Sequence, residues 1–391
     1  MRVLHVGPRP DVGEGNGVDV ATWPLISAQV DRGAKVAVLV MGKVDPRAHA
    51  EAARRGVRLQ VADLRRLLPG ARGVATLLDD LRPDIVHLHS VFLPAHALLA
   101  GGCRARGVAY VVTPHGGLNL FRGRGKKEVY GALIEKPYLR RAACVFALTE
   151  RERGVLGRWL SGRLGRCVVL PNPLAPAPSA ASWAPPAQLA LTYVGRYDVQ
   201  KKGLDRLVDL ATRLPEVSVH AFGSATGSEC GAFRALVRRG LPRNMTFQAP
   251  VYGTTKRAVV AAASLYIHLA RNEGFGMSIV EAMQLGVPVA VAEECDLADQ
   301  ISAQDLGLVL PPSAEQAADV IRRALADPSQ LAHWSRRGQK WVRQELGPDR
   351  LASVTLGVYE SVVDVPSRRP RRPADFLPDA TAQRPCQSSG C

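Results

Sequence analysis

Short segments that are apolar at nearly every position recur along the chain, and longer stretches with helical periodicity separate them. A continuous apolar run predicts a strand buried on both faces, as in a parallel sheet with helices on either side. The runs are residues 2–7, 35–42, 84–90, 109–116, 144–150 and 167–173 in the first half, and 189–196, 217–223, 245–250, 265–271, 288–293 and 307–312 in the second. Two sets of about six such units predict an α/β protein with two Rossmann-like, doubly wound domains.

A segment rich in Pro, Ala and Ser, residues 171–188, separates the two sets and predicts neither a strand nor a long helix. We therefore expect a first domain over residues 1–175 and a second over residues 186–348. Helical patterns continue to about residue 363. Residues 366–391 lose all periodicity, which predicts a disordered basic tail.

Composition narrows the class of protein. A chain of 391 residues with 47% hydrophobic and 22% charged residues is typical of a soluble globular protein with two or three domains. No apolar run is long enough to span a membrane, and the N-terminal run is too short for a signal peptide. The seven cysteines are scattered and form no Cys-x-x-Cys pair. They argue against a disulfide framework or a structural zinc site, and we expect a cytoplasmic protein.

The net charge of +16 raises the question of nucleic-acid binding. The basic residues are spread over many segments, and aromatic residues make up only 5% of the chain. An interleaved aromatic and basic platform is therefore missing. The charge favours a basic surface that attracts anionic ligands or an anionic membrane.

Ligands of doubly wound domains bind beyond the carboxyl ends of the strands, so the residues after each run are the candidates for a site. In the second half, Arg196 follows a buried strand, and Lys201 and Lys202 precede the glycine that opens an amphipathic helix. Cations at a helix N-terminus suit a diphosphate. Solvated charges on a loop are the alternative.

The stretch RNEGFGMSIVEAMQLG places Glu273 before a Gly-Phe-Gly turn and Glu281 inside the helix that follows. The turn allows backbone N–H groups to converge on an anion. Carboxylates on both sides suit a ligand with hydroxyls on either side of its phosphates, as in a nucleotide sugar. The alternative is two exposed helix charges.

The first half carries a glycine-rich turn and a pair of histidines. Gly13, Gly15 and Gly17 are spaced too evenly for the dinucleotide fingerprint, so the turn is either a backbone-amide loop near a ligand or a surface turn. His87 and His89 alternate on a strand. They could bind a metal as a pair, but no carboxylate or cysteine cluster accompanies them, which favours packing at the strand end.

Several of these motifs together resemble glycosyltransferase family 4, the retaining two-domain enzymes of the GT-B fold. The resemblance covers nearly all of residues 1–365. It is most specific in the second half, in Gly-Arg followed by Lys-Gly and in two glutamates with seven residues between them. Its motifs are TPHGG, LPNP, GR with KG, E-x7-E with GFG inside it, and EAMQLGVPV (Thr113–Gly117, Leu170–Pro173, Gly195–Gly203, Glu273–Glu281 and Glu281–Val289).

The resemblance implies a GT-B arrangement in which the first domain binds the acceptor, the second binds the nucleotide sugar, and a C-terminal helix over residues 349–365 packs back on the first domain. Arg196 and Lys202 would hold the donor diphosphate, Glu281 the ribose and Glu273 the hydroxyls of the sugar, with His115 near the reacting carbon. The expected catalytic residues are Arg196, Lys202, Glu273 and His115, and the expected donor-binding residues are Gly15, Gly17, Gly195, Lys201, Gly274, Phe275, Gly276, Met277 and Glu281.

The expected reaction is transfer of a hexose from a nucleoside-diphosphate sugar, with UDP favoured, to a hydroxyl of a glycan, a lipid-linked saccharide or a secondary metabolite. Polysaccharide assembly and antibiotic biosynthesis are both compatible with it. No cofactor is expected beyond the nucleotide sugar. The chain has no Asp-x-Asp motif, so we expect a metal-independent reaction in which protein cations neutralise the leaving diphosphate.

A basic amphipathic stretch within residues 122–141 could touch the inner face of an anionic membrane. The alternative is a solvated basic loop before a packed helix.

Three other functions remain open. A nucleotide-sugar epimerase of similar architecture would consume donor without an acceptor. A basic nucleic-acid-binding protein would show salt-dependent oligonucleotide binding, although no nucleic-acid partner is expected. An NAD-dependent oxidoreductase would need the glycine fingerprint that the chain lacks.

Overall fold

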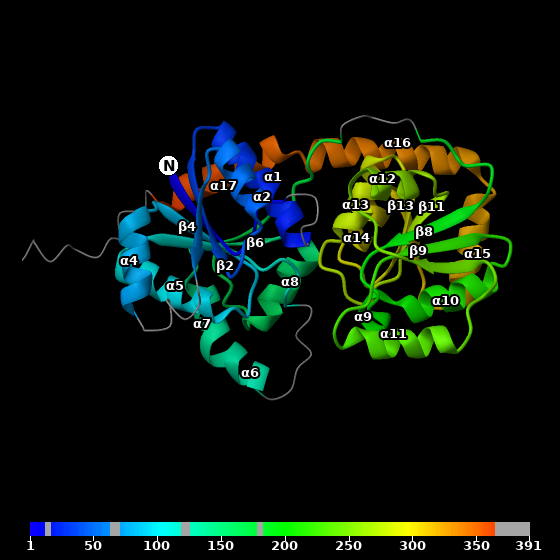
Figure 1. Cartoon of the computed structure of the whole chain (residues 1–391), viewed down its shortest axis with the longest axis horizontal. Helices are drawn as coiled ribbons and strands as arrows, with labels where there is room; N and C mark the ends of the chain where they lie inside the picture. Colours follow the sequence, from blue (N-terminus) through cyan, green and yellow to red (C-terminus); the bar gives the residue numbers. More distant parts are fainter. Residues whose placement is uncertain (12–16, 63–70, 119–125, 178–182, 364–391) are drawn as a thin grey trace, which may run out of the picture.

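The computed structural model describes residues 1–11, 17–62, 71–118, 126–177 and 183–363. They form two lobes side by side, each a parallel sheet with helices on both faces (Figure 1). The first lobe contains β1 (Arg2–Val6), α1 (Gly17–Asp31), β2 (Lys35–Met41), α2 (Pro46–Arg54), β3 (Arg58–Ala62), α4 (Ala71–Leu81), β4 (Ile85–His89), α5 (Pro94–Ala105), β5 (Ala109–Thr113), α6 (Lys126–Tyr130), the π-helix η1 (Gly131–Glu135), α7 (Lys136–Arg141), β6 (Cys144–Ala147), α8 (Glu150–Trp159) and β7 (Cys167–Val169).

The second lobe has the same alternation of strands and helices. It contains β8 (Ala190–Val194), α9 (Val199–Lys202), α10 (Leu204–Arg213), β9 (Ser218–Phe222), α11 (Glu229–Arg238), β10 (Met245–Gln248), α12 (Gly253–Ala261), β11 (Leu265–His268), α13 (Met277–Gln284), β12 (Val289–Ala292), α14 (Ala298–Ala303), β13 (Gly307–Leu310), α15 (Ala314–Leu325) and α16 (Pro328–Glu345). Helix α17 (Pro348–Val363) follows at the end of the described chain.

Both sheets are doubly wound, as the apolar runs predict. The strand order is β3-β2-β1-β4-β5-β6-β7 in the first sheet and β10-β9-β8-β11-β12-β13 in the second, and every pairing is parallel. The strand order reverses beside β1 and β8, so the loops that follow β1 and β4 meet at one edge, and those after β8 and β11 at another. These are the switch points where doubly wound sheets bind ligands.

The first sheet has seven strands rather than the expected six. The additional strand, β3, pairs only with β2 and lies at the sheet edge. Its sequence RLQVA mixes polar and apolar residues, and Val61 is 41% exposed. Because an edge strand is partly solvated, it does not show the continuous apolar pattern by which the inner strands are recognised.

Helix α17 returns from the second lobe and packs on α1 of the first (Figure 1). Leu351, Ala352 and Tyr359 share a hydrophobic core with Trp23 and Ile26. The last described helix is therefore part of the first lobe's core, although it follows the second lobe in sequence.

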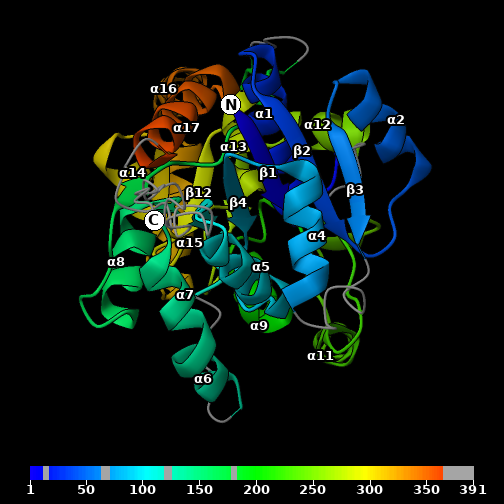
Figure 2. The same ribbon diagram turned by 90° about the vertical axis from the view of Figure 1, so that its left-hand side faces the viewer.

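Helix α6 and the π-helix η1 extend from the lower end of the first lobe (Figure 2). They expose Val129 and Leu133, the latter to 71%, next to the partly exposed Ile134. No helix in the described ranges is long and apolar enough to cross a membrane.

Candidate active site

A cleft of about 1240 Å³ lies between the lobes and is large enough for a nucleotide sugar. The first lobe contributes Trp23, His115 and Asn172 to its lining. The sequence-predicted residues in the lining are Gly17, His115, Gly195, Arg196, Lys202, Glu273, Gly274, Phe275, Gly276, Met277 and Glu281. Gly15 lies outside the described residues, and Lys201 lies outside the lining.

The two lobes touch at a pair of glycines, one of which, Gly274, lines the cleft. A Cβ on Gly116 would lie 2.7 Å from the Cα of Gly274, and a Cβ on Gly274 would lie 2.6 Å from the Cα of Gly116. This approach of two backbones excludes any side chain at either position. It brings the loop that carries His115 against the loop that carries Glu273.

An arginine joins the lobes beside this contact. The Arg151 guanidinium pairs with Asp299 at 2.5 Å and donates to the carbonyl oxygens of Glu293 and Cys295 at 2.7 and 3.0 Å. The first lobe therefore holds the segment after β12 of the second lobe through three acceptors.

Glu273 is a largely buried charge of the cleft, with its side chain 17% exposed. Its Oε2 accepts hydrogen bonds from Lys202 Nζ and from His268 Nε2, the latter at 2.9 Å. Burial alone would raise the pKa of Glu273, but the Lys202 charge and the hydrogen bonds from His268 and Lys202 outweigh it and hold the pKa well below the usual range. Glu273 is therefore a carboxylate that accepts hydrogen bonds and does not supply a proton.

The position of Lys202 depends on the glycine that follows it. Gly203 has φ 67°, and a Cβ there would lie 2.0 Å from the Leu269 carbonyl oxygen. Helix α9 can thus turn into α10 directly against the end of β11, which places Lys202 beside Glu273. Lys201 points elsewhere, since its Nζ lies 3.7 Å from Asp198 and its side chain is 53% exposed.

Two other predicted residues form ion pairs at the cleft. The exposed Arg196 guanidinium pairs with Glu229 at 2.9 Å. Glu281 pairs with Lys256 of α12. Helix α13 begins after Gly276, which has φ 69°, so the first amides of α13 lie at the cleft between Glu273 and Glu281.

His115 lies opposite, on the loop after β5. Its backbone has φ 53°, a left-handed conformation that is uncommon for a histidine. The buried Glu152 carboxylate accepts the Gly116 N–H at 2.7 Å and holds this loop. Burial lowers the pKa of His115 to about 4, and the neighbouring Asn172 side chain offsets part of this effect. His115 is therefore neutral at physiological pH.

Sequence reasoning missed three residues that hold these groups in place: Glu152, Lys256 and His268. His268 carried a usable signal, because it is the polar residue that ends the otherwise apolar run LYIH. Glu152 and Lys256 look like ordinary charges on surface helices. Their roles become visible only through their tertiary contacts, with the Gly116 N–H and with Glu281 respectively.

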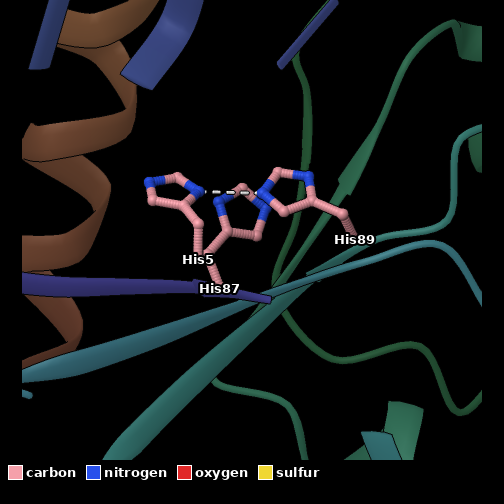
Figure 3. Close-up of side chains that lie close together, drawn as sticks. All are labelled: His5, His87 and His89. Atoms are coloured by element: carbon pink, nitrogen blue, oxygen red, sulfur yellow. Dashed lines mark hydrogen bonds between the residues drawn. The ribbon is translucent and has the colours of Figure 1, made fainter. Parts of the chain in front are cut away.

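A buried histidine cluster lies on one face of the first sheet, where the side chains extend from β1 and β4 (Figure 3). One ring nitrogen from each of His5, His87 and His89 lies within 4.8 Å of the others. All three side chains are buried, and the rings of His87 and His89 are stacked with centroids 4.0 Å apart. The cluster contains the two histidines noted in the sequence and adds His5 from β1.

Comparisons with known proteins agree with this geometry. The family described as Glycosyl transferases group 1 matches residues 181–341, and the Glycosyl transferase 4-like domain matches residues 16–173. A 2-deoxystreptamine glucosyltransferase of Streptomyces kanamyceticus is 27% identical over 290 residues, which is 68% of this chain and 75% of that protein. A D-inositol 3-phosphate glycosyltransferase of Jonesia denitrificans is 31% identical over 170 residues, 41% of this chain and 40% of that protein.

Among solved structures, Anabaena HepE in complex with UDP and glucose superposes with a TM-score of 0.73 at 18% identity, over 92% of this chain and all of HepE. The two parallel sheets and the cleft between them define the GT-B fold. Within that class, the chain belongs to glycosyltransferase family 4, the retaining enzymes also called glycosyl transferases group 1. The fold, the family and the enzyme class expected from the sequence are confirmed.

Proposed function

We propose that the protein transfers a hexose from a nucleoside-diphosphate sugar, with UDP as the nucleotide, to a hydroxyl of a glycan, a lipid-linked saccharide or a small metabolite. The observation that carries this proposal is the set of charges at the second switch point. Two cations, Arg196 and Lys202, border the cleft together with two carboxylates, Glu273 and Glu281, and the start of α13 lies between these carboxylates. The names of the Streptomyces enzyme and of the HepE complex with UDP and glucose support a glucosyl donor.

Each charge has a role that matches one part of the donor. Arg196, Lys202 and the first amides of α13 bind the diphosphate. Glu281 accepts from the ribose hydroxyls and Glu273 from the hydroxyls of the hexose. In the free protein Lys202 already pairs with Glu273, so an arriving diphosphate gives this lysine a second anionic partner.

The proposed reaction proceeds through an oxocarbenium-like transition state, with negative charge gathering on the departing diphosphate. Arg196 and Lys202 stabilise that charge as it grows. Glu273 is held as a hydrogen-bonded carboxylate. We therefore assign Glu273 to positioning the sugar. In the proposed reaction, the acceptor hydroxyl attacks the sugar on the face from which the diphosphate leaves. The leaving phosphate takes up the acceptor's proton, and the anomeric configuration is retained.

The two lobes divide this work. The lobe formed by residues 1–175 binds the acceptor, with α17 as part of its core, and the lobe formed by residues 186–348 binds the donor. The apolar side chains exposed on α6 and η1 support a peripheral contact of residues 122–141 with a membrane that carries a lipid-linked acceptor.

Calorimetric titration with UDP-glucose in the presence of a chelator tests the donor assignment. We expect binding without metal. Binding that appears only after magnesium is restored contradicts the role given to the two cations. Conversion of the donor into a second sugar nucleotide in the absence of an acceptor would identify an epimerase. NMR of the transfer product then reads the anomeric configuration, and inversion rules out same-face attack.

A further inference from the structure

A continuous line of hydrogen bonds runs through the core of the first lobe and ends at the cleft. Gln29 Oε1 lies 2.8 Å from His5 Nε2, His5 Nδ1 lies 2.8 Å from His89 Nε2, and His89 Nδ1 lies 3.0 Å from His115 Nε2. Figure 3 shows the central link, between the His5 and His89 rings. Gln29, His5 and His89 are buried, whereas His115 lines the cleft.

The direction of the first hydrogen bond follows from the partners of Gln29. Its Nε2 faces Thr355 Oγ1 at 3.2 Å and Tyr359 OH at 3.4 Å. The Thr355 hydroxyl has a single proton, which is directed at the helix carbonyl oxygens of Leu351 and Ala352 at 2.8 and 2.9 Å. Toward Gln29 this hydroxyl can only accept, so the amide nitrogen must face it. The amide oxygen therefore faces His5.

This orientation determines the protonated nitrogen of every ring in the line. An amide oxygen can only accept, so His5 carries its proton on Nε2. Burial lowers the pKa of His5 to about 4 and that of His89 well below its ordinary value, so both rings are neutral and carry one proton each. His5 Nδ1 then accepts from His89 Nε2–H, and His89 Nδ1 accepts from His115 Nε2–H. His115 is left with a lone pair on Nδ1, a buried atom that has no hydrogen-bond partner among the residues that the structure describes.

We propose that Gln29, His5 and His89 are positioning residues that fix His115 in its Nε2–H tautomer, so that its Nδ1 offers a hydrogen-bond acceptor to a sugar hydroxyl in the cleft. This inference rests on the proposed function, because it assigns a partner to His115 in that reaction. The opposite tautomer would present an N–H at the same atom and would require a different partner. A line of neutral rings anchored by an amide keeps the acceptor form without placing a charge in the core.

A buried metal is the competing explanation of the same histidines. Ligand nitrogens about 2.0–2.1 Å from a zinc ion are separated by roughly 3.3 Å in a tetrahedral site. His5 Nδ1 and His89 Nε2 are only 2.8 Å apart, a hydrogen-bond distance. Both nitrogens of His87 also have hydrogen-bond partners, Tyr359 OH at 2.6 Å and Thr113 Oγ1 at 2.7 Å. The geometry is that of a hydrogen-bonded network.

Tautomers are read directly by two-bond ¹H–¹⁵N correlation NMR of the full-length protein labelled with ring-¹⁵N histidine, because protonated and unprotonated ring nitrogens differ strongly in chemical shift. His115 is assigned by the loss of its signals in His115→Ala. We expect His115, His89 and His5 to be protonated on Nε2 only. A His115 ring protonated on Nδ1 overturns the proposal, whatever the enzyme transfers. One zinc per purified chain that disappears in His5→Leu overturns it as well.

Two variants at one position separate this role from simple packing. His89→Leu removes the acceptor for His115 Nε2–H, whereas His89→Asn keeps an acceptor oxygen where Nδ1 stood. We expect His89→Leu to yield a mixture of His115 tautomers and a loss of roughly tenfold in kcat/KM, and His89→Asn to restore both. Thr113→Val is the matched control, because it breaks a buried histidine hydrogen bond outside the line.

Unchanged tautomers in His89→Leu, or an equal loss of kcat/KM in Thr113→Val, contradict the proposal. A changed tautomer without any change in activity shows that the line exists but does not serve the proposed reaction, and it removes the sugar hydroxyl as the partner of His115.

Discussion

Replacing Lys202 by alanine is the sharpest test of the donor site. Lys202 lines the cleft, is 18% exposed and pairs with Glu273. A cation about 4 Å from a phosphate oxygen contributes roughly 4 kcal/mol at an effective dielectric constant near 20. Only the part that grows as the glycosidic bond breaks accelerates the reaction. If half of this interaction energy develops only in the transition state, Lys202→Ala lowers kcat by about 30-fold, which corresponds to about 2 kcal/mol.

The ion pair with Glu273 adds a second effect that must be separated from the first. Removing Lys202 leaves the buried carboxylate with His268 as its remaining hydrogen-bond partner, which destabilises the fold. The double variant Lys202→Met with Glu273→Gln removes both charges together. We expect urea unfolding to show that the double variant recovers stability lost in Lys202→Ala, while its turnover stays low.

Lys201→Ala is the matched control, since Lys201 is the neighbouring lysine but lies outside the lining of the cleft. Initial rates with UDP-glucose and an acceptor are measured for all variants at saturating donor. We expect the rate of Lys201→Ala to differ from wild type by less than threefold, because exposed ion pairs contribute little free energy. Wild-type turnover in Lys202→Ala, or an equal loss in Lys201→Ala, refutes the assignment of Lys202 to the diphosphate.

Four further outcomes follow from the structure. Arg196→Ala lowers turnover at least tenfold by the same electrostatic argument, and a fully active variant removes this residue from the site. Gly274→Ala forces the lobes apart and lowers kcat by roughly 100-fold with little change in thermal unfolding, whereas a shift in Tm without a loss of rate contradicts it. The buried histidines His5 and His115 have pKa values of about 4, so as the pH falls the unfolded state takes up protons at a higher pH than the folded state does. The free energy of unfolding in urea therefore falls between about pH 6.5 and about pH 4, by up to about 1.4 kcal/mol per pH unit for each histidine, and a flat profile excludes this. Liposome co-sedimentation with anionic lipid decreases in Leu133→Glu if the exposed apolar residues touch a membrane, and equal sedimentation with neutral lipid argues against the contact.

The residues that the sequence places at the cleft are those with a local signal. Glu273 and Lys202 follow buried strands in doubly wound units, and the strand order places such residues at the switch point. The sequence favoured Lys202 over Lys201 only through the resemblance to the family motif. The different positions of the two side chains depend on the close approach of Gly203 to the end of β11. Strand β3 was missed because it lies at an edge and lacks the continuous apolar pattern.

The partners of these residues were beyond the reach of the sequence. Lys256 of α12 pairs with Glu281, and Glu152 of α8 holds the loop of His115, yet both look like surface charges on their own helices. His87 and His89 were noted as a pair. Their relation to His5 depends on the pairing of β1 with β4, which periodicity alone does not specify.

The amino-acid sequence by itself determined the alternation of buried strands and helices, the two doubly wound units and the charged residues at their strand ends. These features repeat within a few residues, so burial and periodicity encode them locally. The tertiary structure decided which charges pair, how two glycines bring the lobes together, and which nitrogen of His115 carries the proton. Those properties depend on contacts such as that of Gln29 with Tyr359, which lie 330 residues apart. Only the return of α17 to the first lobe creates that contact.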